Sequence, residues 1–352
     1  MRPYLETVHG AAVQDVRVSP LQGGAAGDKG YGYGIPLRVD YVVAGEARSA
    51  VLETVRSGPF GHEHMSDRAQ ALLWAHQAFA RLPRHVPSIG VGAVRADGAL
   101  QSLAEAEEFF IVTRFVAGRE YAGDLQRLRE GAALAPLDQA RADALCDYLV
   151  EIHAVRGPDP GLYVRRIREL IGHGECIFGI SDSYPLPTGF ITAELLRSVE
   201  RQCVDWRWRL RGRGHRLRQV HGDFHPWNLL FRERTDFTVL DRSRGEWGEP
   251  ADDVACLTLN YLFFSLRRHG RLEGGFETLF RGFWDRYLEH SADHEMLEVV
   301  APFYAFRALV IASPLWYPSL DETLRRRIFD FLQAVLGETR FDPARVNDYC
   351  GA

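Results

Sequence analysis

Two segments near the middle of the chain carry side chains suited to phosphoryl transfer. Residues 221–231 read HGDFHPWNLLF, and residues 237–245 read FTVLDRSRG. Phosphoryl transfer needs a base that orients a hydroxyl group and hard oxygen ligands that hold Mg²⁺ against the phosphates. The carboxylate of Asp223 can serve as the base, while the carboxamide of Asn228 and the carboxylate of Asp241 can bind the metal. This spacing predicts a magnesium-dependent phosphotransfer site.

These side chains need a hairpin to bring them together. Residues 229–231 and 237–240 are apolar runs on either side of the polar turn 232–236, which is typical of two short antiparallel strands. Such a hairpin places Asn228, just before the first strand, near Asp241, just after the second. Taken alone, the HGD segment is more simply a turn, and an Asp after a strand is more simply a cap or a turn. The three side chains in this order and at this spacing indicate a site much more strongly.

The order HGDxHxxN, an apolar stretch and then Asp resembles the aminoglycoside phosphotransferase and choline kinase superfamily of small-molecule kinases, which have a protein-kinase-like fold. The segment GEPADDVA at 248–255 is similar to another motif of this superfamily, and weaker likeness extends over most of the chain. The resemblance implies that Asp223 is the catalytic base and that Asn228 and Asp241 bind Mg²⁺. It implies ATP, or alternatively GTP, as the donor and a hydroxyl of a small metabolite or antibiotic as the acceptor. It also implies that Asp253 caps the next helix or holds the catalytic loop.

The first third of the chain has the pattern of a small antiparallel sheet with one main helix. The predicted strands are rich in β-branched or other apolar residues and are separated by turn residues. They cover residues 16–21, 35–43, 49–55 and 109–116. Apolar residues at helical spacing predict a helix over 66–82. The break at Ala117-Gly118 predicts the boundary of an N-lobe over 1–116.

The remainder, 117–352, is predicted to be a mainly helical C-lobe that carries the catalytic hairpin. Apolar residues at helical spacing predict a helix over 137–155, and further helices are predicted over 252–268, 274–290, 296–312 and 321–336. The segments near 161–175 and 190–212 fall between the first of these helices and the expected catalytic loop. The resemblance implies that they form a helical insertion that helps to shape the acceptor pocket. The predicted fold class is α+β, a two-lobed protein-kinase-like fold.

Six glycines fall between positions 23 and 34, between the first two predicted strands. Glycine allows backbone N–H groups to approach phosphate closely and to adopt positive φ. A flexible hairpin turn is the simpler alternative, but the place of this segment ahead of the boundary between the lobes favours nucleotide binding. The predicted nucleotide contacts are Gly24, Gly27, Lys29, Gly30 and, against adenine, the backbone of Arg114, Phe115 and Val116.

One expected cation is missing from this arrangement. The resembled kinases carry a Lys on the third strand that contacts the phosphates, and Glu53 stands at that position here. Lys29 is the single Lys among 42 Lys and Arg residues, and it lies in the glycine-rich segment. We hypothesise that Lys29 takes over the phosphate contact, with a solvated loop Lys as the equal alternative. Glu53 also leaves open a nucleotide-binding pseudokinase that acts as an interaction module, or an enzyme that transfers a nucleotide.

The bulk composition excludes several classes of protein. A net charge of −5 gives no electrostatic case for nucleic acid binding. The five cysteines lack the spacing of a metal site or a disulfide framework, and the first residues lack the apolar core of a signal peptide. The most apolar late segment, 302–317, contains Arg307 and is too short to span a bilayer. We therefore expect a cytoplasmic protein with no nucleic acid or membrane partner, and no pattern indicates its oligomeric state.

Opposing charges near the predicted site leave the acceptor open. The acidic residues Glu246, Glu249, Asp252 and Asp253 favour a cationic acceptor such as an aminoglycoside. Arg242 and Arg244 favour an anionic metabolite or stabilise charge during transfer, unless they form ion pairs with those carboxylates. The motif therefore specifies the expected reaction more closely than the molecule that accepts the phosphate.

Overall fold

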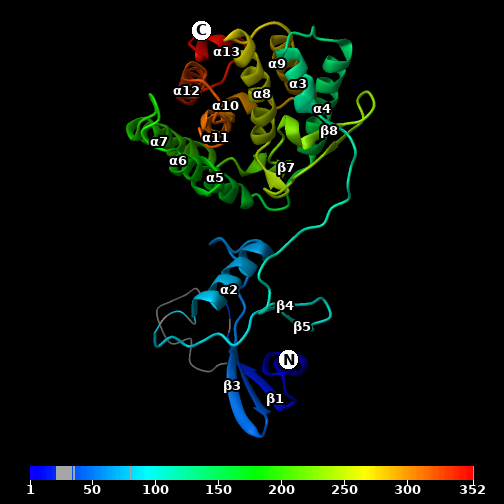
Figure 1. The fold of residues 1–352 in the computed structure, drawn as a ribbon, viewed down its shortest axis with the longest axis vertical. Coiled ribbons are helices and arrows are strands. Elements are labelled where there is room, and N and C mark those ends of the chain that lie inside the picture. Colours follow the sequence, from blue (N-terminus) through cyan, green and yellow to red (C-terminus); the bar gives the residue numbers. More distant parts are fainter. Residues whose placement is uncertain (21–33, 35, 80, 82, 352) are drawn as a thin grey trace. The chain divides into compact units, whose positions relative to one another are not determined.

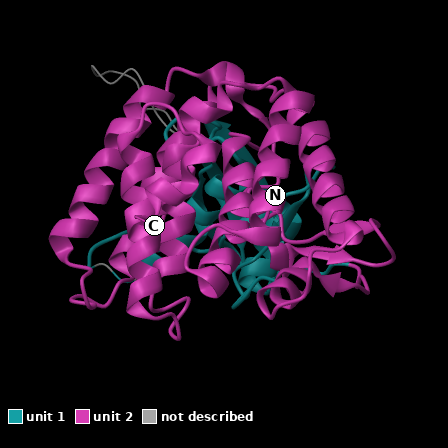
Figure 2. Ribbon diagram, turned by 90° about the horizontal axis from the view of Figure 1, so that it is seen from above, with its two compact units in different colours: residues 1–113 teal, residues 114–352 magenta. Residues whose placement is uncertain are grey.

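The computed structural model describes residues 1–20, 34, 36–79, 81 and 83–351. The chain divides into two compact units, Met1–Thr113 and Arg114–Ala352, which Figure 2 shows in different colours. Each unit has its own buried core. We call them the N-terminal and the C-terminal unit. Among the described helices, none is both long enough and apolar enough to cross a membrane.

The N-terminal unit is built around a three-stranded antiparallel sheet. Its elements are α1 (Arg2–His9), β1 (Val13–Pro20), β2 (Leu37–Val43), β3 (Glu46–Leu52), α2 (Met65–Phe79), β4 (Gly92–Val94) and β5 (Leu100–Ser102). The strand order is β1-β2-β3, with Val39 of β2 opposite Val18 and Ala50. Ala44 and Gly45 have φ values of 51° and 81°, so they form a two-residue hairpin turn whose twist suits the strands. The predicted sheet and helix are present.

The core of the N-terminal unit is small. Among the described residues, it consists of Leu5 from α1, Val13 from β1 and three residues of β2 (Val39, Tyr41 and Val43). The helix α2 has no buried side chain. Few of the described apolar side chains therefore pack against this sheet.

The predicted strand over 109–116 is wrong. The chain between positions 106 and 118 forms no regular element, and Phe110, Ile111 and Phe115 are between 87% and 93% exposed. A strand is defined by its hydrogen-bonded neighbour, and an apolar, β-branched composition does not show whether such a neighbour exists. The strands nearest in sequence, β4 and β5, pair with each other in the described part of the chain.

The C-terminal unit is mainly helical, as predicted (Figure 1). Its helices are α3 (Tyr121–Arg129), α4 (Pro136–Ala154), α5 (Leu162–Gly172), α6 (Ile177–Asp182), α7 (Ala193–Leu210), α8 (Ala251–His269), α9 (Gly274–Ser291), α10 (Met296–Val299), α11 (Ala301–Ala312), α12 (Glu322–Gly337) and α13 (Val346–Tyr349). The helix predicted over 296–312 is split into α10 and α11. Pro302 lies in the first turn of α11. Backbone N–H groups in the first turn of a helix have no partner within the helix, so the lack of one in Pro costs nothing there.

Short strands in this unit position the loop at residues 220–228, which carries the predicted site residues Asp223 and Asn228. They are β6 (Arg119–Glu120), β7 (Arg218–Gln219), β8 (Leu229–Phe231), β9 (Phe237–Val239) and β10 (Trp247–Gly248), with 3₁₀ turns at Gly214–Arg216, Pro226–Asn228 and Pro343–Arg345. One sheet has the order β6-β8-β9, and β7 pairs with β10. The loop with the predicted site residues thus runs from β7 to β8, and the chain after β9 leads to β10.

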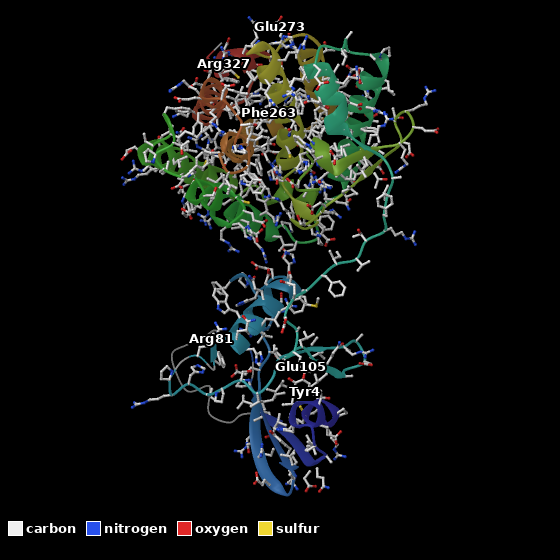
Figure 3. The ribbon with its side chains drawn as sticks, viewed as in Figure 1. Tyr4, Arg81, Glu105, Phe263, Glu273 and Arg327 are labelled. Carbon is white, nitrogen blue, oxygen red and sulfur yellow. The ribbon has the colours of Figure 1, made fainter. Side chains whose placement is uncertain are left out.

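Helix α8 lies at the centre of the helical core. Nearly every residue from Ala251 to Leu266 is buried, including Phe263 (Figure 3). It packs against α9, α11 and α3. The combination of small antiparallel sheets and a large helical unit confirms the predicted α+β fold class.

Candidate active site

The predicted hairpin is formed by β8 and β9. Leu229 pairs with Val239, and Leu230 pairs with Thr238. Beyond the strands, the backbone N–H of Leu240 donates to the carbonyl of Asn228 at 2.8 Å. Because Asp241 follows Leu240 directly, the hairpin brings Asn228 and Asp241 to the same end.

The loop before the hairpin is held by Asp253 on α8. The backbone N–H groups of His221 and Gly222 each donate to its carboxylate at 2.7 Å, and His153 Nε2 lies 3.1 Å from it. Burial alone would raise the pKa of Asp253, but the hydrogen bond and charge of His153 and the contribution of His221 lower it. The predicted role of Asp253 in holding the catalytic loop is therefore confirmed.

His221 ties the loop to the end of β9. Its Nε2 lies 2.8 Å from the carbonyl oxygen of Leu240, and its Nδ1 accepts the backbone N–H of Asp223 at 3.3 Å. Donation from one ring nitrogen and acceptance at the other require a neutral imidazole with its proton on Nε2. His221 therefore orders the backbone on both sides of the hairpin.

Asp223 presents one free carboxylate oxygen. Its Oδ1 accepts a hydrogen bond from Nη1 of Arg307, whereas Oδ2 is 3.5 Å from His225 Nε2. Burial would raise the pKa of Asp223, but the charges of Arg307, His225 and Arg244 lower it overall. The residue is thus ionised at neutral pH. Gly222, with a φ of 87°, makes the turn that precedes it.

Asn228 and Asp241 also keep oxygen atoms free. The amide Nδ2 of Asn228 donates to the backbone carbonyl of Asp223 at 3.0 Å, so its Oδ1 faces no competing donor among the described residues. Asp241 is exposed, has a φ of 53°, and forms no side-chain hydrogen bond or ion pair with any described residue. Asp tolerates this left-handed conformation better than most side chains.

This donor set fits Mg²⁺ bound together with a nucleotide. In the described part of the chain, no group of three or more His, Cys, Asp or Glu side chains could hold a metal by itself. Mg²⁺ usually takes one or two protein oxygens and completes its octahedron with waters and substrate phosphates. Asn228 and Asp241 supply two hard oxygens of that kind.

Arg307 is a site residue that sequence analysis missed. It is 7% exposed, and its guanidinium contacts Asp223, the carbonyl of Gly222 at 2.8 Å, and Oδ1 of Asp252 at 2.6 Å. One signal was available, since Arg307 is the single charged residue of the apolar helix α11. A buried guanidinium requires an acidic partner, so its position already indicated a carboxylate nearby.

The two arginines after Asp241 do not pair with the nearby carboxylates. Arg242 donates to the backbone carbonyls of Val220 at 3.0 Å and Glu246 at 3.1 Å. Arg244 donates to Cys176 Sγ at 3.4 Å and lies 5.0 Å from the ring centre of Phe306. Arg242 therefore braces the loop backbone, while the hydrogen bond and the ring contact of Arg244 are made with neutral groups and its charge acts on Asp223 from a distance.

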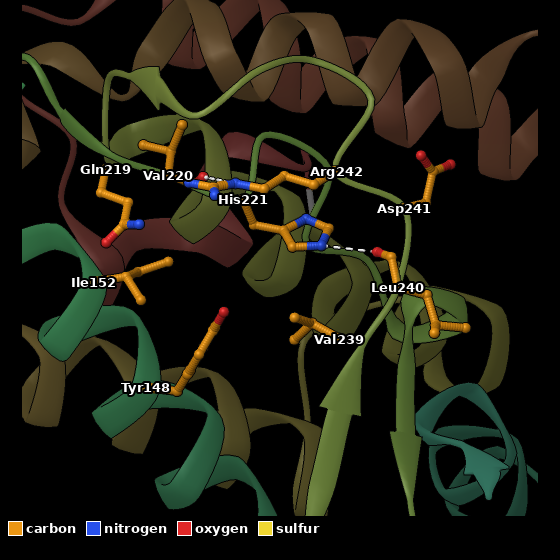
Figure 4. A pocket seen from close by; sticks show the side chains of 9 residues that line it. All are labelled: Tyr148, Ile152, Gln219, Val220, His221, Val239, Leu240, Asp241 and Arg242. Atoms are coloured by element: carbon orange, nitrogen blue, oxygen red, sulfur yellow. Dashed lines mark hydrogen bonds between the residues drawn. The ribbon is translucent and has the colours of Figure 1, made fainter. Parts of the chain in front are cut away.

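A cavity of about 220 Å³ lies between α4, the chain from β7 to His221, and the end of β9 (Figure 4). Its lining is Tyr148, Ile152, Gln219, Val220, His221, Val239, Leu240, Asp241 and Arg242. The Asp241 carboxylate points away from Tyr148, Ile152 and Gln219 in Figure 4. Ligand pockets usually measure about 300–1,000 Å³, so this cavity is small for a substrate site.

The predicted nucleotide contacts fall in two separate stretches of the chain. Gly24, Gly27, Lys29 and Gly30 lie outside the described residues. Arg114, Phe115 and Val116 lie in the irregular chain after Thr113, and their adenine contact stays a prediction. Glu53 follows the last residue of β3 and is exposed.

The profile of the phosphotransferase enzyme family matches residues 38–296, which is well over half of the chain. A search of curated proteins finds no match.

Several solved kinase structures resemble the chain. Glucosamine kinase in complex with glucosamine, ADP and inorganic phosphate is 18% identical over 66% of this chain and 57% of its own, with a TM-score of 0.35. Amicoumacin kinase hAmiN in complex with AMP-PNP, Ca²⁺ and Ami is 15% identical over 94% of this chain and 91% of its own, with a TM-score of 0.42. A choline/ethanolamine kinase family protein from Mesorhizobium loti is 14% identical over 95% and 92%, with a TM-score of 0.37. The chain thus spans little more than half of the glucosamine kinase, and likenesses at these scores identify neither its substrate nor its site residues.

Proposed function

Because the chain belongs to the phosphotransferase enzyme family, we propose that it transfers the γ-phosphoryl group of ATP to a hydroxyl group of a small molecule, with Mg²⁺ as the metal. The observation that carries this proposal is the set of free oxygens around the hairpin. Asp223 Oδ2, Asn228 Oδ1 and the Asp241 carboxylate all lack hydrogen bonds from the described residues. Their backbones are joined by the contacts of the catalytic loop with β8 and β9.

The chemistry that we assign to Asp223 is orientation of the acceptor. The hydroxyl oxygen of the acceptor forms a bond to the γ-phosphorus while the bond from that phosphorus to the bridging oxygen of ADP breaks, and ADP keeps the electron pair. Asp223 orients the hydroxyl and receives its proton on Oδ2. Because the transition state of phosphoryl transfer is loose, a weakly basic carboxylate is sufficient for this role.

Asn228 and Asp241 would hold Mg²⁺, which supplies positive charge next to the phosphate oxygens. The glycine-rich segment with Gly24, Gly27, Lys29 and Gly30 would contact the phosphates, and the backbone of 114–116 would contact the base. ATP is the proposed donor, with GTP as the alternative.

The test is phosphate transfer from ATP to a panel of hydroxylated metabolites and antibiotics in the presence of Mg²⁺, with products detected by mass spectrometry. We expect one acceptor to gain the mass of a phosphate. Asp223→Asn should lower the transfer rate by roughly 10²- to 10⁴-fold, which is the usual contribution of a positioned base. Asp236→Asn is the matched control, because Asp236 is an exposed carboxylate paired with Arg232. Normal transfer by Asp223→Asn would refute the role of this residue.

Glu53 favours a second candidate, a nucleotide-binding pseudokinase. An exposed carboxylate follows β3, where the resembled kinases carry a phosphate-binding Lys. Under this alternative the purified protein binds a nucleotide but transfers nothing to any acceptor. A product heavier by a whole nucleotide would instead indicate nucleotidyl transfer.

A further inference from the structure

The side chain of Arg307 connects the catalytic carboxylate to two buried helices. Its guanidinium group donates four hydrogen bonds: one to Asp223 Oδ1, one to the carbonyl of Gly222 and two to Asp252 Oδ1. The Asp252 bonds come from Nε at 3.1 Å and from Nη2 at 2.6 Å. Arg307 therefore contacts both the side chain of Asp223 and the backbone directly before it.

We propose that Arg307 is a positioning residue that holds Oδ1 of Asp223 and thereby leaves Oδ2 to receive the acceptor hydroxyl. This inference rests on the proposed function, because it assigns a purpose to the free oxygen of Asp223. Arg307 acts through Asp223 and does not itself touch the reacting atoms.

Asp252 fixes the guanidinium in this orientation. It lies in the first turn of α8, and Arg307 lies in α11, which packs against α8. The ring of Phe306 lies against the guanidinium at 4.6 Å from its centre. A planar group held on one edge by a carboxylate and on one face by an aromatic ring has little freedom to turn.

The remaining neighbour of Asp223 does not fix its side chain. His225 Nε2 is 3.5 Å from Oδ2, which is longer than an ordinary hydrogen bond. The terminal torsion of an Asp side chain is broad and two-fold, so an unrestrained carboxylate samples many orientations. Among the described residues, the Arg307 bond is thus what distinguishes Oδ1 from Oδ2.

A Lys at this position would reproduce the charge but not the geometry. A guanidinium offers five donors in a rigid planar fork, and four hydrogen bonds here use that fork. An ammonium has three donors on a flexible stem. Arg307→Lys therefore removes the planar geometry but keeps the positive charge, whereas Arg307→Met removes both.

The kinetic test measures kcat and KM for ATP and for the acceptor found in the screen above. We expect kcat to fall on the order of 10²-fold in Arg307→Met, as misplacement of a catalytic group does, with an unchanged KM for ATP. Arg307→Lys should recover part of this loss. In the Asp223→Asn background, Arg307→Met should cause little further loss, because residues that act as a unit are not additive.

The matched control is Arg325→Met. Arg325 on α12 is 6% exposed, nearly the same as Arg307, but its hydrogen-bond partners among the described residues are the backbone carbonyls of Ala312, Tyr317 and Leu320. The Arg325→Met variant therefore measures how much the loss of a buried guanidinium lowers activity through its effect on folding. A kcat loss in Arg307→Met that is no larger than in Arg325→Met would overturn the proposal.

A second measurement does not depend on turnover. Urea unfolding of Arg307→Met, Asp223→Asn and the double variant tests the contact itself, and we expect the shifts in unfolding midpoint not to add. Additive shifts would overturn the proposal even if the enzyme is active. If the unchanged protein transfers no phosphate, the proposed function fails instead, and the unfolding cycle alone then decides whether Arg307 holds Asp223.

Discussion

The N-terminal and C-terminal units differ sharply in how much apolar side chain they bury. Among the described residues, helix α8 alone has more buried side chains than the whole core of the N-terminal unit. Regions with few buried apolar contacts open locally at lower cost in free energy than well-packed regions. From the described residues, we expect the loop that carries Asp223 and Asn228 to lie in the unit that opens less readily.

The loop that carries Asp223 is anchored to the buried helices of the C-terminal unit. Its backbone is held by Asp253 of α8 and by Arg307 of α11, and both side chains are buried. Donors and acceptors that are fixed before the substrate arrives do not have to be ordered during the reaction. We therefore expect changes in the C-terminal unit to lower kcat, and changes in the N-terminal unit to weaken nucleotide binding.

Among the further variants that compare the two units, the largest effect is expected at the proposed metal ligand Asp241. Asp241→Ala removes one of two hard oxygens, which should cost several kcal/mol of transition-state stabilisation, or roughly two to three orders of magnitude in kcat. The half-saturating Mg²⁺ concentration should rise as well. The measurement is a Mg²⁺ titration of the initial rate, with a chelator to establish the baseline.

Asp236→Asn is again the control for Asp241→Ala, since both residues belong to the same hairpin region and are exposed. A Mg²⁺ dependence of Asp241→Ala that matches the unchanged protein would contradict the assignment of Asp241 as a ligand.

A pair of buried leucines tests the difference in core size directly. Leu145 in α4 is 0% exposed and Leu5 in α1 is 2% exposed. Large-to-small changes in a core cost about 2–5 kcal/mol, and the cost is lower where neighbours can relax into the gap. Leu145→Ala should thus destabilise the C-terminal unit strongly, whereas Leu5→Ala should destabilise the N-terminal sheet and lie at the lower end of this range.

Amide hydrogen exchange followed by mass spectrometry reports each unit separately. We expect Leu5→Ala to lose protection in β1, β2 and β3 while α8 and α11 stay protected. Equal loss of protection in both units for either variant would contradict the view that the units have independent cores.

Local patterns were enough to predict much of this fold. The hairpin of β8 and β9 follows from two apolar runs around a polar turn, and α4 follows from helical spacing after Pro136. The spacing of Asp223, Asn228 and Asp241 predicted which residues the hairpin would gather. These features depend on residues that are close in sequence, where periodicity carries the information.

Features that depend on distant residues were missed. Arg307 reaches Asp223 across 84 positions, and no local pattern shows which carboxylate a buried arginine will meet. The strand predicted over 109–116 failed for a related reason, because its composition does not identify a pairing partner. A lone charge in an apolar helix is the one local sign of such long-range contacts.

A smaller effect is expected from the proposed phosphate contact of the N-terminal unit. Lys29→Ala should remove a hydrogen bond to a charged group, worth about 1.5–3 kcal/mol, and so raise the KM for ATP by roughly 10- to 100-fold. The kcat should change much less, in contrast to Asp241→Ala. Glu53→Gln is the companion variant and should lower the KM for ATP by removing a negative charge. An unchanged KM in Lys29→Ala would eliminate this role.

The smallest effect is the pH dependence that Asp253 gives to the C-terminal unit. Its folded-state pKa is lowered, despite burial, by His153 and His221, so its contribution to stability is complete above the ordinary Asp pKa of 3.8 and is lost as the pH falls through the lower folded value. Each unit of pKa difference corresponds to about 1.4 kcal/mol. Asp253→Asn should be less stable than the unchanged protein at neutral pH, and the gap should narrow as the medium becomes acidic. Urea unfolding from neutral pH down to about pH 2 measures this gap, and a gap of constant size would show that folding does not lower the pKa of this carboxyl.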